Sequence, residues 1–86
     1  MSWPCVCCGY FTLPSPTGSS DEICPVCFWQ DDHVDNRGTD VLGPNKVELS
    51  VARANYARLG AHEERWVSHV RPPLPEELPP HARRAQ

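Results

Sequence analysis

Two pairs of cysteines constrain what this chain can fold into more than any other feature. The pairs are Cys5-x-x-Cys8 and Cys24-x-x-Cys27, with fifteen residues between them. A two-residue gap lets both sulfurs of one turn point at the same ion, and two such turns complete a tetrahedron with Zn–S distances of about 2.3 Å. The spacing therefore predicts one closed structural site for a single zinc ion. Iron is the alternative metal, because a tetrahedron of four sulfurs accepts either ion.

The residues inside and beside the pairs suit such turns. Gly9 follows Cys8, where the turn needs a positive φ or a close approach to backbone. Pro25 fixes φ near about −65° inside the second pair. Cys7 lies too close to Cys5 to form the turn with it, so we interpret it as a spare small residue at the edge of the site, with a redox role as the alternative. A thioredoxin-like use is disfavoured, because that motif places one pair at a helix N-terminus in a larger α/β domain.

Length and charge limit the functional classes. With 86 residues the chain makes one small domain, which needs a staple such as a metal to supplement a modest core. The formal net charge is −3, and four thiolates around a divalent cation would lower it by about two more, which disfavours nucleic acid as a partner. We find no apolar run of roughly 18 residues and no secretory leader. We therefore expect no membrane span and a reducing compartment, the cytoplasm, where paired CxxC motifs bind metal.

The order of the motifs predicts a metal-centred hairpin over residues 3–29. Residues 10–13 are prone to form a strand, and a stretch rich in Pro, Ser and Gly follows them. Residues 21–23 can then return antiparallel, which brings Cys24 beside Cys8. Such a hairpin is too small to stand alone, so the metal is expected to close its open end.

Two helices are expected after a polar loop with one helical turn at most over residues 28–46. The first spans 49–59, with Ser50 as its cap and Gly60 as its left-handed C-terminal residue, and the second spans 63–70. The first helix presents an apolar face of Leu49, Ala52, Tyr56 and Leu59.

The predicted fold class is small α+β: a zinc-ribbon-like β-hairpin with a four-cysteine metal site, followed by two short packed helices. The domain is expected to cover residues 1–71. The Pro-rich residues 72–86 are expected to form an extended or flexible tail. The helices should pack on the hairpin through Tyr56, Leu59, Trp66 and Val70.

Acidic and histidine residues supply the other candidate chemistry. Asp31, Asp32 and Asp35 follow Trp29 and could bind a hard cation or act as acid–base groups. We favour the interpretation of a solvated loop in which one Asp caps a helix. The histidines, interpreted as solvated surface residues, are His33, His62, His69 and His81.

The arrangement of these motifs resembles the bacterial cysteine-rich CPCC family. The resemblance rests on residues 5–10 (CVCCGY), residues 23–29 (ICPVCFW), the acidic pair after them, residues 43–45 (GPN) and the helix over 49–59, and it covers residues 3–73. Val replaces the Pro that is usual after the first cysteine. The family implies a small metal-binding domain and no established reaction.

A weaker likeness is to rubredoxin, whose metal turns are similar to Cys5-x-x-Cys8-Gly9-Tyr10 and to residues 24–27 (CPVC). The loop between the turns is much shorter here, and Phe28 replaces the usual glycine.

The sequence thus favours a zinc-stabilised module that binds another protein and has no catalysis of its own. The expected binding surface consists of Phe28, Trp29, Asp31 and Asp32, beside the rigid metal scaffold. One alternative is an enzyme or enzyme subunit, such as a hydrolase, that uses Asp31 and Asp32. The other is an electron carrier with iron at the four sulfurs.

Overall fold

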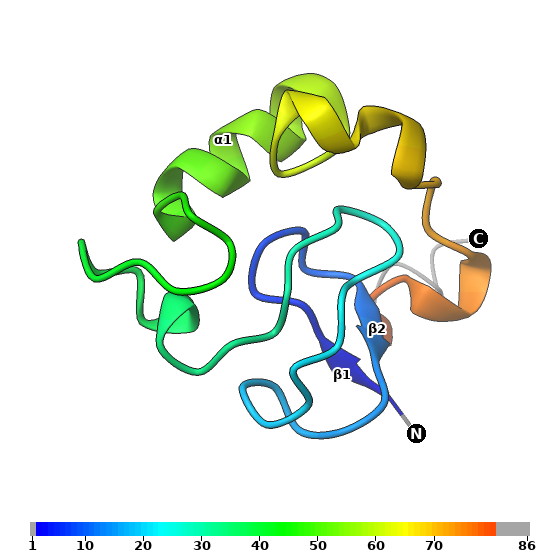
Figure 1. Ribbon diagram of the computed structural model, residues 1–86. Helices are drawn as coiled ribbons and strands as arrows, with labels where there is room; N and C mark the ends of the chain where they lie inside the picture. The colour runs from blue at the N-terminus through cyan, green and yellow to red at the C-terminus, as the bar shows by residue number, and fades with distance from the viewer. Residues whose placement is uncertain (1, 81–86) are drawn as a thin grey trace.

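A computed structural model describes residues 2–80 of the chain and shows a small α+β fold, as predicted (Figure 1). One α-helix and three 3₁₀ helices, labelled η, accompany a two-stranded sheet in the described residues. The elements are β1 (Trp3–Pro4), β2 (Phe11–Leu13), η1 (Asp35–Arg37), α1 (Leu49–Leu59), η2 (Glu64–His69) and η3 (Pro75–Glu77). In Figure 1, α1 and η2 run along one side of the molecule, and the hairpin lies on the other.

The strand pairing differs from the prediction. β1 pairs antiparallel with β2, with Trp3 opposite Leu13, so the first cysteine turn is itself the bend of the hairpin. The prediction that residues 21–23 return antiparallel to the strand at residues 10–13 was wrong. Ile23 instead forms an isolated antiparallel bridge with Gln30, across the second cysteine turn. The reason is local, because each CxxC turn reverses the chain and pairs the residues on its own two sides. We call residues 5–10 the first knuckle and residues 24–29 the second knuckle.

α1 begins and ends at the predicted residues. Gly60 terminates it with a φ of 81°, and its N–H donates to the carbonyl of Tyr56. The cap at the other end was mispredicted: Glu48, in extended conformation, is the N-cap residue and makes no side-chain capping hydrogen bond, while Ser50 lies inside the helix. On the predicted apolar face Leu49 and Ala52 are buried, whereas Tyr56 and Leu59 are half-buried.

The second predicted helix forms as the 3₁₀ helix η2 rather than as an α-helix. It covers six residues, which is long for a 3₁₀ helix, and connects α1 to the segment that follows. Trp66 and Val70 are both half-buried. Residues 28–46 form a loop with the single helical turn η1, as predicted.

The core of the molecule is built around the cysteines. The buried cluster also takes in the indole of Trp29, which is fully buried, and the first turns of α1. Its members are Cys5, Cys7, Cys24, Val26, Cys27, Trp29, Leu49 and Ala52. The candidate metal site and the hydrophobic core are therefore one structure, as expected for a chain too short to build a large core.

The chain beyond residue 71 makes contacts that an unattached tail would not make. Glu77 is buried, and both of its carboxylate oxygens accept from the guanidinium of Arg71, at 2.8 and 2.9 Å. The N–H of Leu74 donates to the same carboxylate at 2.8 Å, and η3 packs against β2. The flexibility of the predicted tail stays a prediction, and its residues 81–86, with His81, lie outside the described part of the chain.

Among residues 2–80, no helix is long and apolar enough to cross a membrane.

Candidate metal centre

Four sulfur atoms converge at the centre of the molecule. The Sγ atoms of Cys5, Cys8, Cys24 and Cys27 all lie within 4.8 Å of one another. Cys5 Sγ is 3.6 Å from Cys27 Sγ, and Cys8 Sγ is 3.7 Å from Cys24 Sγ. Four sulfurs placed tetrahedrally about 2.3 Å from one ion lie about 3.8 Å apart. The donor set and its spacing therefore fit a single tetrahedral metal ion, and the prediction that Cys24 lies beside Cys8 is confirmed.

The two knuckles position their sulfurs with the same backbone hydrogen bonds. In the first knuckle the N–H of Gly9 donates to the carbonyl of Cys5 at 2.8 Å, and the N–H of Cys5 donates to Tyr10 at 2.9 Å. In the second knuckle the N–H groups of Phe28 and Cys24 make the equivalent bonds, both at 2.8 Å. Each turn is thus closed by its own backbone and holds its two sulfurs on one side.

One position in each knuckle requires a left-handed backbone. Gly9 meets this requirement with a φ of 83°, at no steric cost. Phe28 occupies the equivalent position with a φ of 71°, which is unfavourable for a bulky residue. Its ring stacks on Trp66, with the centroids 4.5 Å apart, and this contact compensates for the backbone strain.

Hydrogen bonds among the sulfurs shift the pKa values of the cysteines in opposite directions. Donation from the other thiols, that of Cys27 first, lowers the pKa of Cys24, and the hydroxyl of Thr12 donates to the same sulfur at 3.1 Å. The same hydrogen bonds to Cys24 raise the pKa values of Cys27 and Cys8. Four crowded sulfurs ionise together only beside a cation, so metal binding here must release protons.

His62, in the segment that follows α1, supports the second knuckle by direct contact. Its backbone N–H donates to the carbonyl of Cys27 at 2.9 Å, and its Nδ1 lies 3.1 Å from the same oxygen. The side chain is buried, and this burial lowers its pKa. The prediction of a solvated surface residue was therefore wrong for His62, whereas His33 and His69 are exposed as predicted. No sequence signal ties His62 to a cysteine 35 positions away.

Cys7 lies outside the four-sulfur cluster. It is buried and packs in the core beside the cysteine ligands. This position agrees with the interpretation of a small residue at the edge of the site, and a redox role stays untested.

Asp31 is committed to the fold. Its buried carboxylate accepts from the N–H of Gly18 at 2.8 Å, the hydroxyl of Ser20 at 2.8 Å and the amide of Asn36 at 2.7 Å. Burial raises the pKa of Asp31, but the hydrogen bonds from Asn36, Ser20 and Gly18 outweigh it and lower the pKa overall. Asp31 thereby fixes the loop that joins the two knuckles, so the prediction of a solvated side chain was wrong.

Asp32 and Asp35 have different roles in the loop that follows the second knuckle. Asp32 accepts from the N–H groups of Val34 and Asp35, both at 3.0 Å, and so caps the turn that leads into η1. The N-cap residue of η1 itself is Val34, which makes no side-chain capping hydrogen bond, so the expected aspartate cap holds for the turn and not for the N-cap position. Asp35 is buried and accepts from the N–H of Gly43 at 2.6 Å and from the side chain of Asn45 at 2.8 Å. A side chain at Gly43 would meet these carboxylates within 3.1–3.3 Å, which explains a glycine there.

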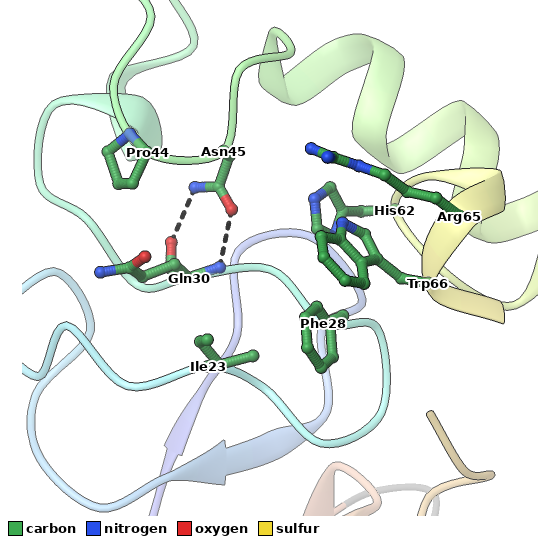
Figure 2. Close-up of a pocket in the computed structure, with 8 residues that line it drawn as sticks. All are labelled: Ile23, Phe28, Gln30, Pro44, Asn45, His62, Arg65 and Trp66. Atoms are coloured by element: carbon green, nitrogen blue, oxygen red, sulfur yellow. Dashed lines mark hydrogen bonds between the residues drawn. The ribbon is translucent and has the colours of Figure 1, made fainter. Parts of the chain in front are cut away.

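The predicted binding surface does not exist as an exposed patch. Trp29 and Asp31 are fully buried, and the indole Nε1 of Trp29 donates to Asn36 at 2.8 Å. Phe28 and Asp32 are half-buried. Phe28 instead lines a cleft beside η2, together with Ile23, Gln30, Pro44, Asn45, His62, Arg65 and Trp66 (Figure 2).

The fold and the sulfur geometry together define a small four-cysteine domain with a candidate metal centre. A model of the cysteine-rich CPCC family matches residues 3–77, and the chain belongs to this family. No curated protein and no solved structure shows a significant match to the chain.

Proposed function

We propose that the four cysteines bind one zinc ion as a structural centre. The observation that carries this proposal is the enclosure of the donor set: Cys5, Cys24 and Cys27 are buried, and only Cys8 is half-buried. Four protein sulfurs complete a tetrahedron and leave no position for a substrate, which distinguishes structural zinc sites from catalytic ones. Bound zinc would offset part of the negative charge of the crowded thiolates and fasten the two knuckles to each other.

The module that this centre stabilises acts, we propose, by binding another protein in the cytoplasm, without catalysis of its own. The contact surface is the cleft that Phe28 lines, in place of the buried side chains of Trp29 and Asp31. The net charge of −3 argues against nucleic acid as the partner. The hydrolase alternative is weakened, because the carboxylate of Asp31 is already occupied by structural hydrogen bonds.

Elemental analysis of protein purified under reducing conditions tests the metal centre. We expect one zinc per chain, and we expect a strong chelator to unfold the protein, because metal-binding energy is folding energy at such sites. A red protein that contains iron would favour the electron carrier instead. A folded chain without metal would contradict the proposal.

Capture of partners by a tagged chain from its native host tests the interaction. Ile23→Ser is the variant to compare with the wild-type chain, because Ile23 lines the cleft and its side chain is exposed. Its apolar side chain makes no hydrogen bond to the cysteines. We expect this variant to keep its zinc and lose the partner. Equal capture by both chains would show that the cleft is not the contact surface.

A further inference from the structure

Two exposed large apolar side chains of the described chain are adjacent in one loop, and a third lies in the cleft. Val41 is 61% exposed, Leu42 is 48% exposed and Ile23 is 47% exposed, while Val51, Val67 and Leu74, in other segments, are each 44% exposed. Ile23 belongs to the cleft of Figure 2. Val41 and Leu42 belong to the loop that follows η1 and projects from the body of the molecule in Figure 1; we call residues 39–42 the tip. Single exposed apolar side chains are normal on a protein surface, so these residues indicate an interaction site only together with the shape and the charge of the cleft.

The size of the cleft suits a side chain rather than a small molecule. Its volume is about 160 Å³, below the range of about 300–1,000 Å³ that small-molecule sites occupy. Figure 2 shows Ile23 and Phe28 on one side of the cleft, with Trp66 and Arg65 above Phe28. Asn45 closes the opposite wall by a pair of hydrogen bonds with the backbone of Gln30, at 2.8 and 2.9 Å.

The charges of the tip and the cleft are complementary. The guanidinium of Arg65 lies over the ring of Trp66, 4.6 Å from its centroid, at the rim of the cleft. Within the chain, Arg65 forms an ion pair with Glu63 at 3.0 Å. Such a solvent-exposed ion pair contributes little to stability, so Arg65 can pair with another carboxylate instead. The tip carries Asp40 directly before its aliphatic pair. An acid followed by aliphatic side chains is the complement of a guanidinium beside an apolar cleft.

We propose that the tip of one copy of this chain occupies the cleft of a second copy, and the reverse, in a twofold symmetric dimer. The tip and the cleft are neighbours, because Leu42 is two residues before Pro44, which lines the cleft. One patch thus contains both complementary halves, which is what a twofold interface requires. This inference rests on the proposed interaction function and names the partner as a second copy.

Sedimentation or light scattering over a concentration series tests the dimer. Two small contacts make a weak dimer, so the average mass should rise with concentration. Leu42→Ser should raise the dissociation constant about tenfold or more. Val51→Ser is the matched control, because Val51 is similarly exposed on α1 and belongs to neither the tip nor the cleft. This variant should leave the dissociation constant of the dimer unchanged.

A charge exchange tests the pairing itself. Arg65→Glu and Asp40→Lys should each weaken the dimer, and the double variant should recover part of the loss. A wild-type chain that stays monomeric at its solubility limit overturns the inference, and so does a double variant no better than the singles. Zinc content, measured on every sample, separates the two proposals: a zinc-loaded monomer overturns only the dimer, whereas a folded chain without zinc overturns only the metal centre.

Discussion

The two knuckles have the same backbone and different surroundings. Both close with the same pair of hydrogen bonds, and both need a left-handed residue after the second cysteine. At Gly9 a Cβ would find nothing within 4 Å, so the first knuckle uses the residue with no steric penalty. At Phe28 the left-handed backbone costs on the order of 1–2 kcal/mol, and the stacking of its ring on Trp66 offsets this cost. The hydrogen-bonded CxxC turn thus dictates the left-handed backbone, and the tertiary neighbours select the side chain.

The second knuckle is also the better anchored of the two. Its carbonyl groups at Pro25 and Cys27 accept from the N–H groups of Arg71 and His62, at 3.2 and 2.9 Å. Among residues 2–80, the first knuckle has one comparable hydrogen bond from a distant residue, which the exposed Arg53 donates to the carbonyl of Val6 at 2.9 Å. We therefore expect the first knuckle to open before the second when the metal is removed.

The largest effect should come from breaking either knuckle at a ligand. Cys27→Ser removes one of four sulfurs, and metal binding at such sites supplies about 10–16 kcal/mol of apparent folding energy. We expect this variant to lose zinc and unfold, as seen by elemental analysis and circular dichroism. Cys7→Ser is the control, because Cys7 lies outside the cluster, and it should keep the metal. Full zinc occupancy in Cys27→Ser would contradict the assignment.

Asp31→Asn should loosen the loop that connects the knuckles. The amide cannot accept all the donors that meet the carboxylate, so we expect a loss of about 2–3 kcal/mol in chemical denaturation. Because folding lowers the pKa of Asp31, its contribution is present above about pH 4 and is lost as the pH falls through the folded-state pKa. The wild-type and variant stabilities should therefore converge at acid pH. A constant difference at every pH would contradict this role.

Trp66→Ala should act on the second knuckle alone. The side chain is half-buried, so we expect about 2 kcal/mol, below the range of about 3–5 kcal/mol for fully buried aromatics. A double-mutant cycle with Phe28→Gly measures the coupling. Once the ring of Trp66 is gone, Phe28→Gly should become nearly neutral or stabilising, because the tilted contact of Phe28 with His69, at 5.6 Å between ring centroids, offsets less of the backbone strain than the stacking does. Independent effects of the two changes would mean that the stacking does not compensate for the strain.

Gly9→Ala should have the smallest effect and acts on the first knuckle alone. The added methyl group meets open space but must adopt a positive φ, which costs about 1 kcal/mol. Thermal unfolding of the zinc-loaded protein measures this loss. The loss caused by Gly9→Ala should also be measured in the Trp66→Ala background. If it equals the loss in the wild-type background, the two knuckles respond independently to local strain.

The sequence by itself determined the features that depend on residues close together. The spacing of the cysteines determined which four sulfurs cluster, the apolar period over 49–59 determined the bounds of α1, and Gly60 determined its end. Each follows from the geometry of one turn, which neighbouring residues supply.

The tertiary structure decided the partners of side chains that are far apart in the chain. Ile23 pairs with Gln30 rather than with the first strand, His62 is buried against Cys27, and Asp31 binds the loop at Gly18. These outcomes were not readable from the sequence, because the burial of a polar side chain depends on which distant donor reaches it. In a chain this small the four-cysteine cluster lies where those segments meet, and their packing around the sulfurs determines which polar groups lose water and must find a partner within the fold.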